Sequence, residues 1–279
     1  IAVSAVCYTI QLYMDFSGTM DIVIGTGQIF GIKMPENFER PFFSKSISEF
    51  WKRWHITLGT WFKDYIFYPL SMSKPLKKLT SHARKRLGNH FGPLISGAIA
   101  LFCVWICNGL WHGAGWNYIF FGLYHFTWIL LGNIADPLFI WITKKLHINR
   151  NNFFYRCMQM IRTSILVCIG ELFFRANGLR AGLTMFQKIF TDFSLQTVYD
   201  RSIFTFGIDR YDCLIVLVAL SIVFIISVLQ EHHIQVRKQI SKQNMVVRFA
   251  AYYALILLIV VFGAYGKGYI PVDPIYAGF

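Results

Sequence analysis

Two histidines stand where tryptophans, polar side chains and glycines interrupt apolar sequence. His55 lies in SISEFWKRWHITLGTWFKDYIFYPL (46–70), and His112 lies in NGLWHGAGWN (108–117). A histidine that apolar surroundings keep neutral can accept a proton, which is what a general base requires. The glycines of the second motif allow close backbone approach and a break between two helices. Spacing alone fits equally well a structural His112 that only hydrogen-bonds a carbonyl group of the broken helix.

The stretch 46–70 has the signs of a helix start. Ser46 and Glu49 have the S-x-x-E spacing of a capping box, in which hydroxyl and carboxylate each accept a hydrogen bond from the other residue's amide. Glu49 and Arg53 have the i, i+4 spacing of an ion pair on one helical face. We expect this helix to run until Pro69 ends it.

On such a helix the residues at helical spacing share a face with His55. Trp51 and Leu58 would lie on the same side as His55, with Trp54 and Trp61 close beside them. A simpler interpretation is an amphipathic helix at the membrane interface, in which His55 only packs. The stretch by itself does not separate the two interpretations.

A metal site is the other chemistry that histidines allow. His55, His112 and His125 would have to converge, but the sequence contains no H-x-x-x-H or H-E-x-x-H pair. The six cysteines include no Cys-x-x-Cys pair, and nearly all fall inside apolar runs. We therefore predict neither a metal site nor a disulfide framework.

The composition is that of an integral membrane protein. Hydrophobic residues make up 55% of the 279 and charged residues only 15%. The formal net charge of +13 would suit nucleic acid, but the cations lie in loops between apolar runs, where they set orientation in a membrane. We predict a multi-pass plasma-membrane protein that is surrounded by lipid and has no nucleic-acid partner.

Five apolar segments are long enough to cross a bilayer as helices, which takes about 20 residues each. They predict an all-α, polytopic transmembrane helix bundle. The segments are 91–110, 116–141, 157–174, 211–229 and 249–265.

The first apolar run, 1–30, contains two acids and no charged region of a signal peptide. Asp15 and Asp21 would face the bundle interior as functional groups or mark an interfacial break, and we favour the break. Prolines and cations in 33–48 predict an irregular re-entrant or surface connection. Because the chain opens inside an apolar run, we expect further helices before Ile1.

Several motifs together resemble the membrane-bound O-acyltransferase family, and most closely its bacterial branch of alginate O-acetyltransferases and teichoic-acid D-alanyl transferases. The resemblance covers nearly the whole chain. It is carried by DFSGTMDIVIG (15–25), MPENFERPF (34–42), the stretch 46–70, NGLWHGAGWNYIFFGLYH (108–125), the alginate-like FFRANGLRAG (173–182) and GYIPVDPIYAGF (268–279).

This resemblance implies a fold and two catalytic positions. It implies one domain over 1–279, the C-terminal part of a helix bundle that encloses a tunnel, with short re-entrant or interfacial helices. His112 corresponds to the family's catalytic base and His55 to its partner in the tunnel. We expect the substrate to contact Trp51 and Trp54 as well as Trp111 and Asn108.

The implied reaction moves an acyl group, most simply acetyl, from a cytoplasmic thioester to a hydroxyl of an extracytoplasmic polysaccharide or cell-wall glycan. The thioester would be a cosubstrate such as acetyl-CoA or an acyl carrier protein, with no further cofactor. The resemblance also implies an accessory extracytoplasmic acyltransferase as a partner. The sequence Ser71-Met-Ser-Lys74 departs from the family's glycine-rich turn.

The competing class is a transporter or flippase for a glycan or lipid-linked precursor, since such proteins also use broken helices and intramembrane polar residues. The sequence has no evident inverted repeat of interrupted helices. Two histidine motifs favour chemistry over transport. Acyl release that depends on His112 would identify the enzyme, whereas acceptor movement without acyl transfer would identify the transporter.

The distribution of cations predicts the topology. The basic loops 72–90, 144–156 and 231–248 fall on the cytoplasmic side when the five spans alternate, and 175–210 falls outside. In a variant without the native cysteines, Lys78→Cys should resist an impermeant thiol reagent in intact cells, whereas Lys188→Cys should react. Labelling of Lys78→Cys from outside would contradict this topology.

Overall fold

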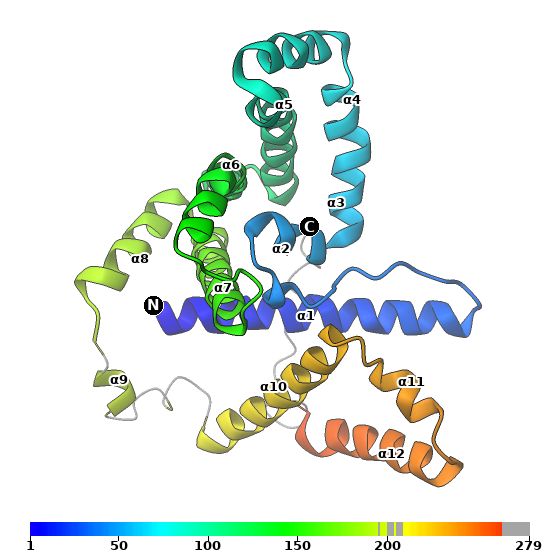
Figure 1. Ribbon diagram of the computed structural model, residues 1–279. Coiled ribbons are helices and arrows are strands. Elements are labelled where there is room, and N and C mark those ends of the chain that lie inside the picture. Colours follow the sequence, from blue (N-terminus) through cyan, green and yellow to red (C-terminus); the bar gives the residue numbers. More distant parts are fainter. Residues whose placement is uncertain (195, 200–203, 205–208, 264–279) are drawn as a thin grey trace. The chain divides into compact units, whose positions relative to one another are not determined.

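The computed structural model describes residues 1–194, 196–199, 204 and 209–263, and these contain helices but no strand. They form two compact units, one within 1–192 and the other within 193–273 (Figure 1). The second unit contains α9 (Gln196–Tyr199), α10 (Arg210–Glu231), α11 (Val236–Ser241) and α12 (Met245–Phe262). The first contains α1 (Ala2–Ile29), η1 (Pro41–Phe43), α2 (Ile47–Arg53), α3 (Ile56–Phe62), η2 (Lys63–Phe67), α4 (Tyr68–Ser71), α5 (Lys74–His112), α6 (Trp116–Lys145), α7 (Phe153–Arg175) and α8 (Leu179–Thr191).

The predicted all-α membrane fold is confirmed. Within the described residues, five helices are long and apolar enough to cross a membrane: α5, α6, α7, α10 and α12. They correspond in order to the five apolar segments of the sequence.

Helix α1 contradicts the break predicted at its two acids. It runs without interruption from Ala2 to Ile29 through Asp15 and Asp21. Asp21 lies on an exposed side of this unbroken helix. The helix also tolerates its glycines, each of which costs about 1 kcal/mol relative to alanine.

The stretch 46–70 is not one helix. Helix α2 ends at Arg53, Trp54 is extended, and His55 adopts left-handed backbone angles (φ 46°, ψ 54°). The preceding connection causes the break, because the Arg53 carbonyl accepts from the Glu39 amide (2.9 Å) and the Asn37 carbonyl accepts from the Ile56 amide (3.0 Å). The predicted helical face shared by Trp51, His55 and Leu58 is therefore wrong.

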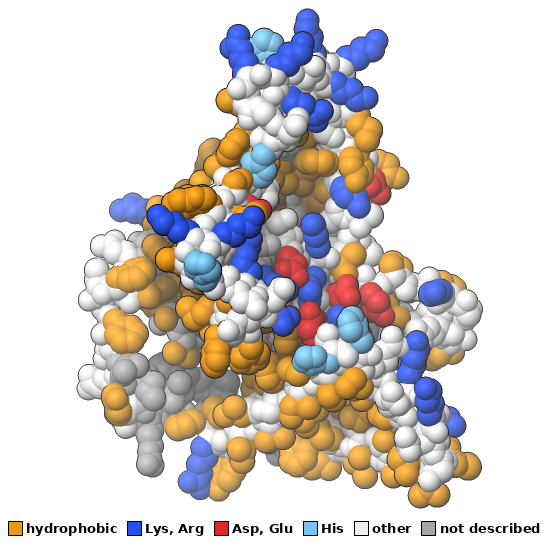
Figure 2. All heavy atoms as spheres, viewed as in Figure 1, with side chains coloured by type: hydrophobic (Ala, Val, Ile, Leu, Met, Phe, Trp, Pro, Cys, Tyr) orange, Lys and Arg blue, Asp and Glu red, His pale blue; other side chains and the backbone are white. Residues whose placement is uncertain are grey.

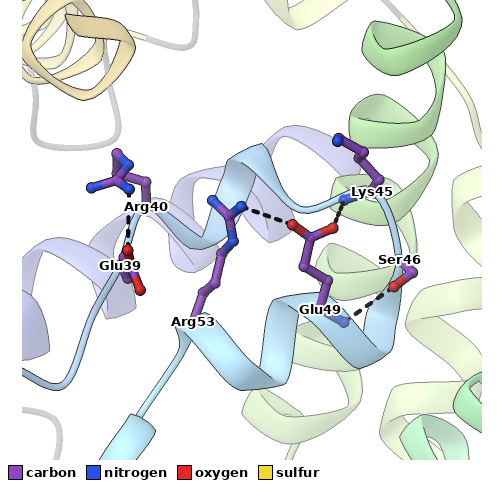
Figure 3. Close-up of polar contacts among 6 residues, drawn as sticks. All are labelled: Glu39, Arg40, Lys45, Ser46, Glu49 and Arg53. Atoms are coloured by element: carbon purple, nitrogen blue, oxygen red, sulfur yellow. Dashed lines mark hydrogen bonds and ion pairs between the residues drawn. The ribbon is translucent and has the colours of Figure 1, made fainter. Parts of the chain in front are cut away.

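The start of α2 is close to the prediction. The Ser46 hydroxyl accepts from the Glu49 amide (3.1 Å), as in a capping box, but the Glu49 carboxylate accepts from the Lys45 amide (2.8 Å) instead of the Ser46 amide (Figure 3). The predicted ion pair between Glu49 and Arg53 is present at 2.8 Å. Figure 3 shows the Glu49 carboxylate between the Lys45 amide, just before α2, and the side chain of Arg53, the last residue of α2.

Pro69 does not end the helical segment as predicted. It lies in the first turn of α4, directly after the π-helical η2. A π-helical turn shifts the hydrogen-bond register, so the missing Pro69 amide interrupts no regular α-helical pairing. Helix α4 continues to Ser71.

The predicted basic loop 72–90 is largely helical. Helix α5 consists of two segments that meet at Gly88 (φ 79°, ψ −176°), and the first begins at Lys74. The two segments fold closely together, since a Cβ on Gly92 would lie 2.4 Å from Arg84 Cα and the Thr80 and Ser96 hydroxyls are hydrogen-bonded. Lys and Arg side chains gather over this part of α5, at the top of Figure 2. Leu, Lys, Arg and Ala favour helix, and charge alone does not make a loop.

Helices α5 and α6 cross at two glycines. A Cβ on Gly122 would lie 2.3 Å from the Trp105 carbonyl oxygen, and one on Gly109 would lie 2.6 Å from the Tyr118 carbonyl oxygen. The helix break follows at Gly113, where φ is 146°. The predicted close approach and break around His112 are both confirmed.

This crossing predicts opposite effects for two glycines of α6. Gly122→Ala should lower the free energy of unfolding by about 1–3 kcal/mol, because the methyl group overpacks the crossing. A Cβ on Gly132 would meet no atom within 4 Å, so Gly132→Ala should be neutral or stabilising, by up to about 1 kcal/mol. Thermal unfolding in detergent measures both. Equal stability of the two variants would contradict the close crossing.

Candidate active site

A cavity of about 300 Å³ lies inside the first unit, among α2, α3, η2, α5, α6 and α7. Aromatic and aliphatic side chains form most of its wall. Its polar lining residues are Ser48, Lys52, His55, Lys63, Asn108, His112 and Glu171. Both predicted catalytic histidines therefore face one mainly apolar cavity.

The hydrogen bonds of Asn37 determine the tautomer of His55. Asn37 Oδ1 accepts from the Thr57 amide (3.3 Å) and the Thr57 hydroxyl (2.6 Å), and His55 Nδ1 lies 3.1 Å away. The atom that faces the Thr57 amide must be an oxygen, because an amide N–H only donates. His55 Nδ1 therefore donates to that oxygen and carries the proton. This leaves the lone pair on Nε2.

Burial also keeps the His55 imidazole neutral. Loss of hydration lowers the pKa of His55 from 6.5 to about 4. The ring packs edge-on against Phe16, with centroids 4.7 Å apart. At neutral pH His55 is thus a neutral imidazole that can accept a hydrogen bond at Nε2.

His112 is the last residue of α5, and its side chain is only 6% exposed. Its ring packs edge-on against Phe174 (4.8 Å between centroids) and Phe121 (5.9 Å). Asn117 fixes this wall, because its side-chain amide donates to the carbonyls of Phe174 and Ala176 (3.3 Å each). The start of α6 and the end of α7 are thereby joined beside the imidazole.

The predicted substrate-contacting residues divide into two groups. Trp51, Trp54 and Asn108 line the cavity with the histidines. Trp111 does not line it and is 43% exposed. Its ring instead contacts both imidazoles, with centroids 6.0 Å from His55 and 4.6 Å from His112.

His125 lies apart from the cavity lining. It is completely buried, and its ring stacks on Trp105 with centroids 5.5 Å apart. Among the described residues, no three His, Cys, Asp or Glu side chains are grouped as metal ligands. His55, His112 and His125 therefore form no shared metal site in this part of the chain.

Two residues of the site were not predicted. Glu171, in α7, lines the cavity and is 2% exposed. An acid inside an apolar span is a functional candidate by default, so its sequence position could have identified it. Asn37 lies in the irregular connection 33–48, and nothing in the sequence pairs it with His55.

The fold and the cavity agree with the comparisons to known proteins. The model of the membrane-bound O-acyltransferase family matches residues 2–85. The chain is 34% identical to the probable alginate O-acetylase AlgI of Pseudomonas aeruginosa over 187 residues, which is 67% of this chain and 31% of that protein. It is 32% identical to the peptidoglycan O-acetyltransferase of Helicobacter pylori over 64% of this chain and 29% of that protein. It is 34% identical to the teichoic acid D-alanyltransferase of Bacillus subtilis over 60% of this chain and 39% of that protein.

The chain belongs to the membrane-bound O-acyltransferase family. Its matched part spans about a third of the length of these relatives. The resemblance noted in the sequence is thus confirmed at the level of the family.

The lowered pKa of His55 predicts a pH dependence of stability. Between pH 6.5 and about 4 the unfolded chain binds a proton at His55 that the folded protein does not, so the free energy of unfolding falls as the pH falls. At about 1.4 kcal/mol per pKa unit, His55 contributes at most about 3 kcal/mol to this loss. His55→Gln should lose correspondingly less stability than the wild type on acidification.

Chemical denaturation in detergent at pH 7 and at pH 4 measures the effect. His82 is exposed, so His82→Gln is the matched control and should follow the wild type. If wild type and His55→Gln lose stability equally, His55 is not buried as described.

Proposed function

We propose that the intact protein is a membrane O-acyltransferase that moves an acyl group, most simply acetyl, from a cytoplasmic thioester to a hydroxyl of an extracytoplasmic polysaccharide or cell-wall glycan. The observation that carries this proposal is that His55 and His112, 57 residues apart in the sequence, line one cavity among apolar helices. The names of the relatives, which include two O-acetyl-transferring proteins and a D-alanyltransferase, support the reaction class.

His112 is the general base of this mechanism. Its neutral imidazole takes the proton from the acceptor hydroxyl as the oxygen attacks the thioester carbonyl. The C–O ester bond forms, the C–S bond breaks, and the leaving thiolate recovers the proton. Phe121 and Phe174 pack against the ring, so the imidazole keeps one orientation.

His55 positions the acceptor in this mechanism. Asn37 accepts the proton of Nδ1, so Nε2 is the ring nitrogen of His55 that can accept a hydrogen bond. A hydroxyl carries one proton, so the hydroxyl that donates to His55 Nε2 is a second one of the acceptor, and the reacting hydroxyl keeps its proton for His112. The predicted pairing of the two histidines thus corresponds to a base and an orienting group.

The other predicted residues surround the reaction. Trp51 and Trp54 form aromatic walls that exclude water from the acyl group. The Asn108 side chain lies one helical turn before His112, and its buried Oδ1 has no hydrogen-bond partner among the described residues. A substrate hydroxyl would satisfy it. Trp111 supports both imidazoles from outside the cavity.

The membrane gives the donor and the acceptor separate entries. A donor such as acetyl-CoA or an acyl carrier protein stays on the cytoplasmic side, and only its acyl end enters the helix bundle. The acceptor arrives from the other face, where an accessory extracytoplasmic acyltransferase would receive or complete the transfer. A charged carrier then never has to cross the hydrocarbon region.

Substitution of His112 by glutamine tests the proposed base. His112→Gln keeps a hydrogen-bonding side chain of similar size but cannot accept and carry the proton. Loss of a positioned base costs about 10²–10⁴ in rate, so kcat for acyl transfer should fall by that factor in the purified, folded full-length protein. The assay follows a labelled acetyl thioester and the esterified glycan.

The matched control is His82→Gln, which should transfer at the wild-type rate because His82 is exposed and lies outside the cavity. Transfer by His112→Gln within a few-fold of the wild type would make His112 structural. Movement of the acceptor across the membrane without esterification would favour a transporter.

A further inference from the structure

Glu171 is the acid of the cavity that the proposed mechanism leaves unused. Its side chain is 2% exposed and lines the same cavity as both histidines. Its Oε2 is buried and has no hydrogen-bond partner among the described residues. Buried polar atoms in proteins are nearly always hydrogen-bonded, and an unpaired one usually marks a ligand or a functional role.

Among the described residues, the cavity wall offers Glu171 Oε2 no hydrogen-bond partner. Most of the lining is aromatic or aliphatic, including Trp105, Phe121 and Phe174. Lys52 and Lys63 also line the cavity, but both are exposed, and neither is ion-paired with Glu171 among the described residues. Leaving a carboxyl group unsatisfied in such surroundings costs folding free energy. A hydroxyl group that enters with a ligand can satisfy this oxygen.

The backbone beside Glu171 is fixed. A Cβ on the preceding residue, Gly170, would lie 2.5 Å from His125 Nε2, so the His125 ring of α6 packs directly against the backbone of α7. Phe174, one helical turn further along α7, packs edge-on against His112 at 4.8 Å. The carboxyl group is thus held on the same helix and within about one turn, or 5.4 Å of rise, of the ring that holds the base.

We propose that Glu171 is a specificity-determining residue that hydrogen-bonds a second hydroxyl of a polyhydroxylated acceptor, while the hydroxyl to be acylated faces His112. This inference rests on the proposed acyl transfer and deepens it. A hydroxyl both donates and accepts, so it satisfies a carboxyl group in either protonation state and requires no cation. A sugar ring presents several hydroxyls on one rigid frame, which suits two polar groups on one cavity wall.

The expected effect on specificity is large. Sites built to hydrogen-bond a substrate hydroxyl reject analogues that lack it, because the buried polar group is then left unpaired. The wild type should prefer a polyhydroxylated acceptor, such as a methyl glycoside, over a monohydric alcohol. Glu171→Leu should reduce the ratio of kcat/KM for the two acceptors by about 100-fold or more. Glu171→Gln retains hydrogen-bonding capacity and should keep most of that ratio.

The experiment uses the purified full-length protein, an acetyl thioester as donor, and the two acceptors in parallel. Leu172→Met changes a buried neighbour that does not line the cavity, and it should keep the wild-type ratio. The midpoint of thermal unfolding is measured for every variant. Glu171→Leu should unfold at a temperature no lower than the wild type, because it removes an unpaired buried polar group.

Each outcome decides the proposal. The proposal is overturned if Glu171→Leu leaves the ratio of kcat/KM for the two acceptors unchanged. It is also overturned if Glu171→Gln lowers this ratio as much as Glu171→Leu does, because that result requires Glu171 to bind a cationic group of the ligand. If Glu171→Leu does not fold, wild-type kinetics with singly deoxygenated glycosides decide instead. If kcat/KM then depends on no hydroxyl except the acylated one, the proposal is overturned.

Failure of the proposed function is separate from failure of this inference. A wild type that transfers no acyl group to either acceptor or to the glycan refutes acyl transfer, and the role of Glu171 with it. A wild type that acylates both acceptors without preference refutes only the role of Glu171.

Discussion

The position of His55 depends on the pairing between the connection at 37–39 and the chain at 53–56. The Glu39 amide donates to the Arg53 carbonyl, where α2 ends. The Ile56 amide, at the start of α3, donates to the Asn37 carbonyl. The side chain of Asn37 then holds His55 Nδ1. One short pairing therefore sets the direction of the imidazole, its tautomer and the entry of the next helix.

Aromatic packing connects this pairing to the second histidine. Trp51 contacts Trp105 of α5 (5.1 Å between centroids), and Phe121 of α6 contacts both Trp51 (5.9 Å) and His112 (5.9 Å). Rings are stiff and bury large areas, so they hold neighbouring helices at fixed distances. The polar groups of the cavity are few and lie inside this aromatic frame, as is usual for sites that bind small ligands.

The sequence predicted the helical class, the five apolar spans and both histidines, because apolar length and local motifs are properties of short segments. It did not predict the break before His55, since that break comes from residues 37–39, which no local pattern pairs with 53–56. The same limit applies to Asn37. The first segment of α5 was missed because its cations were interpreted as a loop, although lysine and arginine favour helix. Glu171 was visible as an acid within an apolar span, but only the fold shows that its side chain faces the cavity.

The left-handed backbone of His55 has a consequence for how this position tolerates change. A residue with a Cβ in that conformation costs about 1–2 kcal/mol, and glycine avoids most of this cost. The fold by itself would thus favour glycine or asparagine where the chain carries histidine. Alanine keeps the strain and removes only the imidazole, whereas glycine removes both. Comparison of the alanine and glycine substitutions therefore separates the role of the imidazole from the strain of the backbone. Glycine at this position would raise the stability of the fold but remove the imidazole from the cavity.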